Sequence, residues 1–453
     1  MSAVSTLPLP RPDALRPRLI ALGAVTSVEF IENGMVMFAA GQIAAGLHLS
    51  AQEFAFAYTL YGAGAILMLF KHRWMVERLG YRRFVLLSLA CFGIGSALCA
   101  LAGGLAQFAA GRLLQGLGGA TFFTAGRLAM NDLPEPARRA GLLTFVASLL
   151  GASAIAPLLA VGLMELGQWR ALFWFGVPQA LLVGWGAHAH LSRSVIPREE
   201  RSTEHWGWLL WLCAGVFGLQ HAIQAIGLGT SEPRTVALAA GTSILMLAVF
   251  AWRQRRRERP LIDCRGLAQQ RYLLGLAMYF IGYCLIGSSG LMVPILLHTV
   301  LSLSLLESAM VTSCAMAGSV TVALLHLRLA QGRPRHRLFM LAGLALFGAG
   351  SLGLSTADAR SAWPELAPAV LAIYLAIPLF LGPVAAATFT GLPGKAFSHG
   401  YQVKNIIRQV GLSSSIALAT VALHLVSREQ VFTLMAMAVI PAGLAVMAQR
   451  EFR

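Results

Sequence analysis

The sequence is poor in charged residues. Asp, Glu, Lys and Arg make up only 12% of its 453 residues, and the mean hydropathy is +0.69. No soluble globular class combines so little charge with 57% hydrophobic residues, so the composition predicts a polytopic membrane protein. A net charge of +16 would suggest nucleic-acid binding in a soluble protein. Here the basic residues cluster between apolar segments, and we expect no nucleic-acid partner.

Patterns that support enzymatic chemistry are also missing from the sequence. The six cysteines have neither disulfide nor zinc spacing, and five of them fall in apolar segments, which is typical of small buried residues. There is no phosphate-binding glycine loop, metal-ligand cluster or nucleophile elbow. We therefore expect no enzyme, no bound metal or cofactor, and no ATP-driven pump.

Long apolar segments make up most of the chain. Each is close to or above the about 20 residues that a helix needs to cross a bilayer, and lipid requires a helical backbone. The fourteen segments are 19–45, 52–71, 83–105, 107–130, 140–164, 171–192, 206–227, 234–253, 272–298, 304–328, 337–356, 364–391, 404–425 and 429–447. The sequence therefore predicts an all-α polytopic membrane protein with fourteen transmembrane helices.

The basic residues predict how the segments are oriented. With a cytoplasmic N-terminus, 28 of the 35 Lys and Arg residues lie on the cytoplasmic side, four lie outside and three lie within segments. Lys404 is counted among the 28, at the start of the thirteenth segment. This asymmetry satisfies the positive-inside rule and predicts that both termini are cytoplasmic. The polar start of the chain has no signal-peptide pattern, so we expect the first segment to act as an uncleaved anchor.

The two longest cytoplasmic connections, 193–205 and 254–271, bracket the seventh and eighth segments. They predict a division into four parts. These are a cytoplasmic tail (1–18), a six-helix bundle (19–192), a two-helix hairpin (206–253) and a second six-helix bundle (272–447). The alternative is a single bundle of fourteen helices.

Two carboxylates, Glu29 and Glu32, lie within the first apolar segment, where an ionisable side chain is costly. Three residues apart on a helix, they share one face, and Asn33 borders them. Burial disfavours the charged form of such a group and a nearby arginine favours it, so the two effects can poise it to take up and release a proton. We predict a proton relay led by Glu32 and supported by Glu29. The alternative is a neutral carboxylate that is hydrogen-bonded to a neighbouring helix.

The stretch GRLLQGLGG (Gly111–Gly119) places an arginine, Arg112, within the fourth segment. Gln115 shares its helix face, and the glycines that follow allow close approach of another helix. We predict that Arg112 biases the charge of the proton site; the alternative is a fixed structural anchor. The residues that we expect to contact substrate are Gln115, Asn33, Tyr58 and Tyr61.

The connection after the second segment, KHRWMVERLGYRR (Lys71–Arg83), is basic and contains a single acid, Glu77. Positive-inside charge is one explanation of this composition. The other is a charged latch that pairs with neighbouring helix ends in one state and opens in another.

Five motifs, in order along the chain, resemble those of the fourteen-span drug:proton antiporter branch of the major facilitator superfamily. Ile31–Ala44 is similar to the first-span pattern, and Met75–Arg83 to the signature between the second and third spans. Gly111–Gly119 resembles the fourth-span motif R-x-x-Q-G-x-G, and Trp169–Pro178 the stretch leading into the sixth span. Asn405–Gly411 resembles the thirteenth-span N-x-x-R-Q-x-G.

The resemblance implies the major facilitator fold and a secondary transporter that exports amphipathic organic compounds against protons, by alternating access, in a bacterial inner membrane. It places Glu32 on the family's first-span aspartate. The residues that we expect to act in conformational gating are Glu77, Gly80, Arg82, Arg83, Pro157, Asn405, Arg408 and Gln409. The implied partners are the lipid bilayer, protons, a small-molecule substrate and, in a Gram-negative source, a periplasmic adaptor protein.

The sequence also departs from the family pattern. The fifth-span antiporter motif keeps only Pro157, Arg73 replaces a glycine of the loop signature, and Gly176 stands where the family has asparagine. These differences leave open a dedicated metabolite or siderophore transporter of the same fold, including an importer. A membrane sensor or scaffold is a further alternative, against which the lack of a sizeable soluble domain argues.

Overall fold

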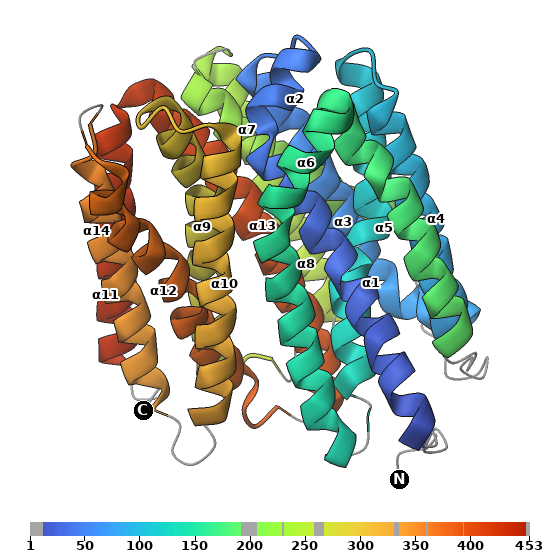
Figure 1. Cartoon of the computed structure of the whole chain (residues 1–453). Coiled ribbons are helices and arrows are strands. Elements are labelled where there is room, and N and C mark those ends of the chain that lie inside the picture. Colours follow the sequence, from blue (N-terminus) through green and yellow to red (C-terminus); the bar gives the residue numbers. More distant parts are fainter. Residues whose placement is uncertain are drawn as a thin grey trace.

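The computed structural model describes residues 12–131, 133, 135–191, 206–228, 231–257, 267–329, 335–358, 361–392 and 394–449. Over this part of the chain the regular structure is entirely helical (Figure 1). The helices are α1 (Pro12–Phe38), α2 (Ala40–Gly46), α3 (Ala51–Leu79), α4 (Tyr81–Ala100), α5 (Leu105–Asn131), α6 (Glu135–His190), α7 (Trp206–Leu228), α8 (Pro233–Arg256), α9 (Gln270–Thr299), α10 (Leu305–Leu329), α11 (His336–Ser355), α12 (Trp363–Phe389), α13 (Gly394–Leu425) and α14 (Arg428–Ala448). The prediction of an all-α polytopic membrane protein is confirmed.

Each apolar segment of the sequence overlaps one or more of these helices. α6 contains two of them, because Gly167 and Gln168 have non-helical backbone dihedrals and divide the helix. The first segment comprises most of α1 together with α2, which follows a turn at Ala39. By length and apolar composition, eleven of the described helices can cross a membrane, and α5 and α13 are not among them. The number of fourteen spans therefore stays a prediction.

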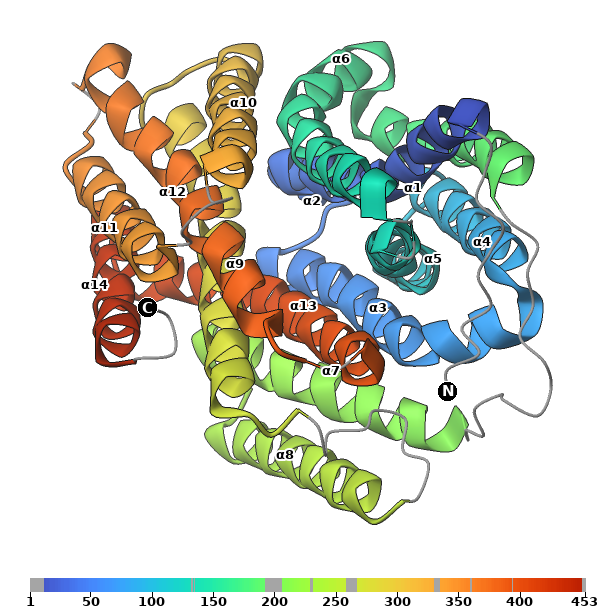
Figure 2. The same cartoon turned by 90° about the horizontal axis from the view of Figure 1, so that it is seen from below.

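Two groups of helices form the bundle, which we call the first group (α1–α6) and the second group (α9–α14). In the first, α1 and α4 both pack on α5 and α6; in the second, α12 packs on α9, α10 and α11. The groups meet where α6 packs on α10 and where α3 packs on α13. Viewed along the bundle axis, α7 and α8 lie at the outside, with α7 against α3 and α13 (Figure 2). This packing agrees with the predicted division into two six-helix bundles and a hairpin between them. The boundaries of these parts, at 19–192, 206–253 and 272–447, stay a prediction.

The first turn of α1 and the last turn of α14 lie at the same end of the bundle, which we call the termini end (Figure 1). At the opposite end, α3 begins with a capping box. The Ser50 hydroxyl accepts a hydrogen bond from the Glu53 backbone N–H, and the Glu53 carboxylate accepts one from the Ser50 N–H at 2.8 Å. Ser427 and Gln430 form the same reciprocal pair at the start of α14. The first N–H groups of a helix lack partners within it, so these boxes determine where the helices begin.

The glycines of GRLLQGLGG bring α5 into direct backbone contact with its neighbours. A Cβ atom on Gly116 would overlap the backbone of Tyr61 in α3, and one on Gly118 would overlap the backbone of Ser88 in α4. From the other side, a Cβ atom on Gly64 of α3 would lie 2.6 Å from the Leu113 carbonyl oxygen. Small residues at these crossings are what allow α5 to lie between α3 and α4.

Adding a methyl group at one of these crossings should therefore destabilise the protein. We expect Gly116→Ala to lower the free energy of unfolding by about 1–3 kcal/mol, the usual effect of overpacking. Gly151→Ala is the matched control, because no heavy atom lies within 4 Å of the added carbon there. Thermal unfolding in detergent compares the two variants. Equal stability of both would show that the α3–α5 contact is not tightly packed.

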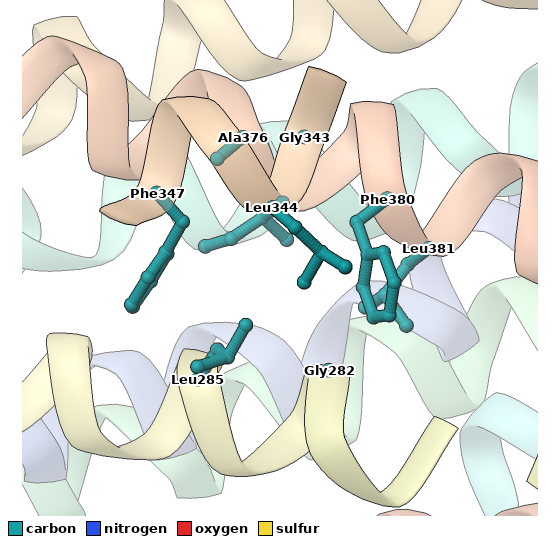
Figure 3. A pocket seen from close by; sticks show the side chains of 9 residues that line it. Gly282, Leu285, Gly343, Leu344, Phe347, Ala376, Phe380 and Leu381 are labelled. Carbon is teal, nitrogen blue, oxygen red and sulfur yellow. The ribbon is translucent and has the colours of Figure 1, made fainter. Parts of the chain in front are cut away.

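A small gap lies among α9, α11 and α12, lined by apolar side chains such as Leu285, Leu344 and Phe380 (Figure 3). Its volume is about 10 Å³. That is at the lower limit for holding one water molecule, and a water would also need polar partners. The gap is therefore a packing imperfection within the second group.

Candidate functional site

A cavity of about 650 Å³ lies between the two helix groups. Residues of α1, α3, α5 and α6 form one side of its wall, and residues of α9, α10, α12 and α13 form the other. Most of the wall is apolar or aromatic, as at Phe30, Met37 and Tyr283. Cavities of roughly 300–1,000 Å³ with such walls are typical of sites for small organic molecules.

Aromatic and apolar side chains of both groups gather toward the two ends of the cavity. Toward the termini end, the ring of Phe123 in α5 stacks on the ring of Tyr401 in α13, with centroids 6.2 Å apart. Phe389 of α12 packs on Tyr401 at 5.8 Å. At the opposite end, Phe38 of α1 belongs to the same apolar cluster as Ala309 of α10. We call these two sets of contacts the Phe123–Tyr401 layer and the Phe38–Ala309 layer.

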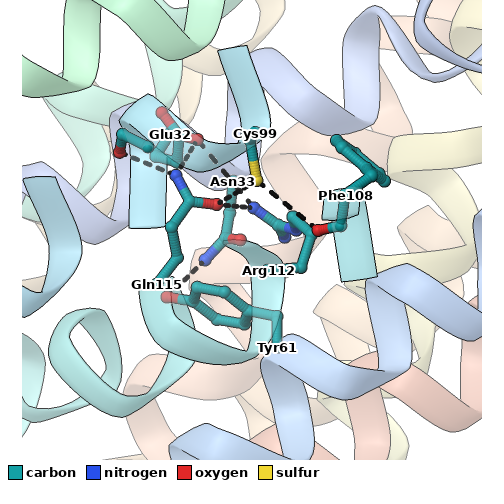
Figure 4. A network of polar contacts seen from close by, with 8 residues as sticks. Glu32, Asn33, Tyr61, Cys99, Phe108, Arg112 and Gln115 are labelled. Carbon is teal, nitrogen blue, oxygen red and sulfur yellow. Dashed lines mark hydrogen bonds and ion pairs between the residues drawn. The ribbon is translucent and has the colours of Figure 1, made fainter. Parts of the chain in front are cut away.

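Glu32 lies behind the cavity wall in a buried polar network (Figure 4). Gln115 donates a hydrogen bond from Nε2 to Glu32 Oε1 at 2.7 Å and contacts Ser96 Oγ at 2.8 Å. Arg112 donates to Gln115 Oε1 at 2.8 Å, and its Nη1 lies 3.9 Å from Glu32 Oε1. Glu32 Oε2 has no hydrogen-bond partner among the described residues. The network therefore holds one carboxylate oxygen and leaves the other available to carry a proton.

Two tyrosines connect this network to the cavity. The guanidinium of Arg112 lies 4.6 Å from the ring centroid of Tyr61 and 5.5 Å from that of Tyr58, and both tyrosines line the cavity. Asn33, also in the wall, donates to the Tyr61 hydroxyl at 3.3 Å. Gln115 is not among the described wall residues, because the network holds it away from the cavity. Contact of these four residues with substrate stays a prediction.

Glu29 pairs with the second helix group, and the sequence analysis did not foresee this. Arg408 of α13 donates from Nη2 to Glu29 Oε1 at 2.7 Å, and Gln409 donates to the same oxygen at 3.3 Å. All three side chains are buried, and the Arg408 guanidinium also lies 4.6 Å from the ring of Phe123. Each carboxylate of α1 therefore has its own arginine and its own glutamine, one pair within the first group and one pair between the groups.

Lys404 is a residue whose position the sequence analysis assigned incorrectly. We expected it at the cytoplasmic start of the thirteenth segment, but α13 begins at Gly394 and Lys404 lies within it, in the cavity wall and only 3% exposed. Its ammonium donates to Asn405 Oδ1 at 3.3 Å. Lys404 lies ten residues inside a helix that also carries Arg408. That placement is the signal that could have identified Lys404 as a buried residue of the site.

The residues of the predicted latch lie at the termini end. Gly80, with a φ of 77°, separates α3 from α4, and a positive φ favours glycine there. Glu77 is buried, and Arg82 Nη2 lies 3.1 Å from His188 Nε2 near the end of α6. Arg83 is exposed. The structure thus joins Arg82 to another helix of the first group, and the gating role of these residues stays a prediction.

Three of the remaining gating residues lie on or beside the cavity. Pro157 of α6 lines the wall on the side of the first group, and Arg408 and Gln409 of α13 line it on the side of the second group. Asn405, one turn before Gln409, is fully buried. Arg408 and Gln409 also contact the Glu29 carboxylate. The gating role of all four residues stays a prediction.

Comparison with known proteins gives three kinds of match. A family model described as Major Facilitator Superfamily matches residues 22–416. Proteins named for multidrug resistance, both called MdtD, are similar over most of the chain. The one from Escherichia coli K12 is 25% identical over 93% of this chain and 88% of its own length. The one from Salmonella typhimurium is 26% identical over 79% of this chain and 76% of its own length.

Solved structures share the fold at low identity. The human organic anion transporter MFSD10 is 14% identical, with a TM-score of 0.62, over 96% of this chain and all of the other. The POT family transporter PepTSo is 14% identical, with a TM-score of 0.70, over 97% of each chain. These likenesses concern the arrangement of helices alone.

Proposed function

The chain belongs to the Major Facilitator Superfamily, and on this premise we propose that it is a proton-coupled secondary transporter that exports amphipathic organic compounds. Carriers of this kind move a solute without changing it chemically, so the protein acts as a carrier and not as an enzyme. The distant similarity to the MdtD proteins supports a substrate range of the multidrug type. We place it in a bacterial inner membrane with both termini cytoplasmic, in line with the distribution of basic residues. A periplasmic adaptor stays an expectation from the resemblance.

The observation that carries the proposal is the pair of buried carboxylates beside the cavity. Glu32 and Glu29 each have one oxygen held by an amide and an arginine, and a second oxygen without a described hydrogen-bond partner. A carboxylate in this setting can exist in a charged and a protonated form, because the arginine stabilises the first and burial the second. Each inward proton yields about 2.3 kcal/mol per 100 mV of membrane potential.

Alternating access follows from the position of the cavity between the two helix groups. Rocking of the groups would separate the Phe123–Tyr401 layer in one state and the Phe38–Ala309 layer in the other. The Glu29–Arg408 pair joins the groups, so loss of this contact would weaken their attraction. In this mechanism Glu32 carries the transported proton, and Glu29 adjusts how readily the groups part.

Proton movement in reconstituted vesicles tests the proposal. Several amphipathic compounds of unrelated structure are expected to cause proton flux through the full-length protein when a pH gradient is imposed. A pH-sensitive dye inside the vesicles measures the flux. Response to a single metabolite would favour the dedicated transporter, and no response above protein-free vesicles to any compound would overturn proton-coupled export.

A further inference from the structure

The cavity wall is basic. The titratable side chains among its described residues, apart from tyrosines, are Lys404, Arg408 and His326, and the wall contains no Asp or Glu among them. Both carboxylates of α1 lie behind the wall, Glu29 against Arg408 and Glu32 against Gln115. A solute in the cavity therefore meets cationic groups first.

The buried charges around the cavity are also unequal in number. On α1, α5 and α13, the described side chains that are both charged and buried are Glu29, Glu32, Arg112, Lys404 and Arg408. These are three cations and two carboxylates. Buried charge is costly without compensation. An anion in the cavity would reduce this excess, and a cation would increase it.

Aromatic rings hold the ammonium of Lys404 at the cavity surface. Its Nζ lies 4.4 Å from the ring centroid of Phe123, 5.0 Å from Tyr401, 5.1 Å from Tyr279 and 5.7 Å from Tyr283. The two pairs, Phe123–Tyr401 and Tyr279–Tyr283, are each stacked. Ring faces attract cations, and here Lys404 already occupies them, so a cationic solute would compete with it.

We propose that the cargo is an amphipathic organic anion whose charged group lies against Lys404. This inference rests on the proposed transport function and specifies its substrate class. The carboxylate, sulfonate or phosphate of the cargo accepts a charge-assisted hydrogen bond from the ammonium. Its apolar body lies along the wall toward Phe30 and Met37, which offer apolar contact area. Lys404 thus selects the sign of the cargo's charge, and the rings accept its body.

A matched pair of ligands tests the sign of the charge. Naphthalene sulfonate and naphthyl trimethylammonium share one aromatic body and carry opposite charges. Binding of each to the full-length protein in lipid nanodiscs is measured by equilibrium dialysis, which needs no transport. We expect the sulfonate to bind about 10-fold or more tightly than the ammonium compound. Equal affinities, tighter binding of the ammonium compound, or binding of neither would overturn the inference.

Variants of Lys404 test its part in the preference. Lys404→Met should weaken sulfonate binding about 10- to 100-fold and leave ammonium binding unchanged or stronger, because it removes one charge-assisted hydrogen bond. Lys404→Arg should keep the preference, and Arg255→Met, an exposed cation at the end of α8, should behave as wild type. Unchanged sulfonate binding by a folded Lys404→Met protein would contradict the assignment. If Lys404→Met does not fold, the relative affinities of the wild-type protein and of Lys404→Arg for the two ligands still test the inference.

The two proposals fail separately in this design. If amphipathic cations drive proton flux and the sulfonate neither binds nor drives it, transport stands and the anionic cargo is wrong. If the sulfonate binds preferentially but no compound moves protons, the binding site stands and proton-coupled export is wrong.

Discussion

Replacing Glu32 with glutamine is expected to reduce proton-driven transport to the level of protein-free vesicles. The variant cannot bind and release a proton at this position, while its amide oxygen can still accept the hydrogen bond that Gln115 donates. Folding and insertion should therefore be retained, and downhill exchange of substrate should continue without a response to pH. Uptake into inverted vesicles, with and without an imposed pH gradient, measures both properties.

The control for this experiment is Glu165→Gln, which removes an exposed carboxylate of α6. That variant should transport as wild type does. If the Glu32→Gln protein shows the same stimulation by a pH gradient as this control, then the coupling proton is carried elsewhere. Glu29 is the next candidate, because it has the same kind of partners.

Removing the guanidinium of Arg408 is expected to cause a large loss of stability. In Arg408→Met, Glu29 would be left buried with only Gln409 as a described hydrogen-bond partner. Removing one member of a buried ion pair typically costs about 3–5 kcal/mol. The double variant Glu29→Gln/Arg408→Met removes both charges and should recover more than half of that loss. Thermal unfolding in detergent is measured for Glu29→Gln, for Arg408→Met and for the double variant. Together with the wild-type protein, these form a double-mutant cycle.

A simple sum of the two single effects in the double variant would contradict direct pairing of these side chains. The Glu29–Arg408 pair joins α1 to α13 and hence the two helix groups. Removing it should therefore also affect transport. The double variant should therefore transport passively but with a changed balance between its two open states.

The sequence could predict a contact between two side chains of this site only where both side chains lie on one helix. Helical spacing placed Arg112 and Gln115 on one face, and the structure shows them in contact. The same spacing put Glu29 and Glu32 on one face, but it could not assign each to a different partner helix. The Glu29–Arg408 contact spans 379 positions of the chain, and only packing of the two groups reveals it.

The least accurate expectations concern polar residues near the limits of segments. Apolarity begins late in α13, so the sequence predicts a connection over the first ten residues of this helix and a cytoplasmic position for Lys404. In the structure a ring of aromatic side chains stabilises that ammonium inside the helix bundle. In the described part of the chain, α5 and α13 are absent from the helices identified by length and apolarity. Apolar patterns therefore indicated where the helices lie, and only the structure showed which polar residues of α1, α5 and α13 meet.

Infrared difference spectroscopy of the reconstituted protein measures the proposed charge change most directly. On substrate binding, the wild-type protein should lose a protonated-carboxyl band as Glu32 releases its proton. The band change should be absent in Glu32→Gln and retained in Glu29→Gln. An unchanged difference band in the Glu32→Gln protein would contradict the central claim that this buried acid changes its protonation state as cargo is transported.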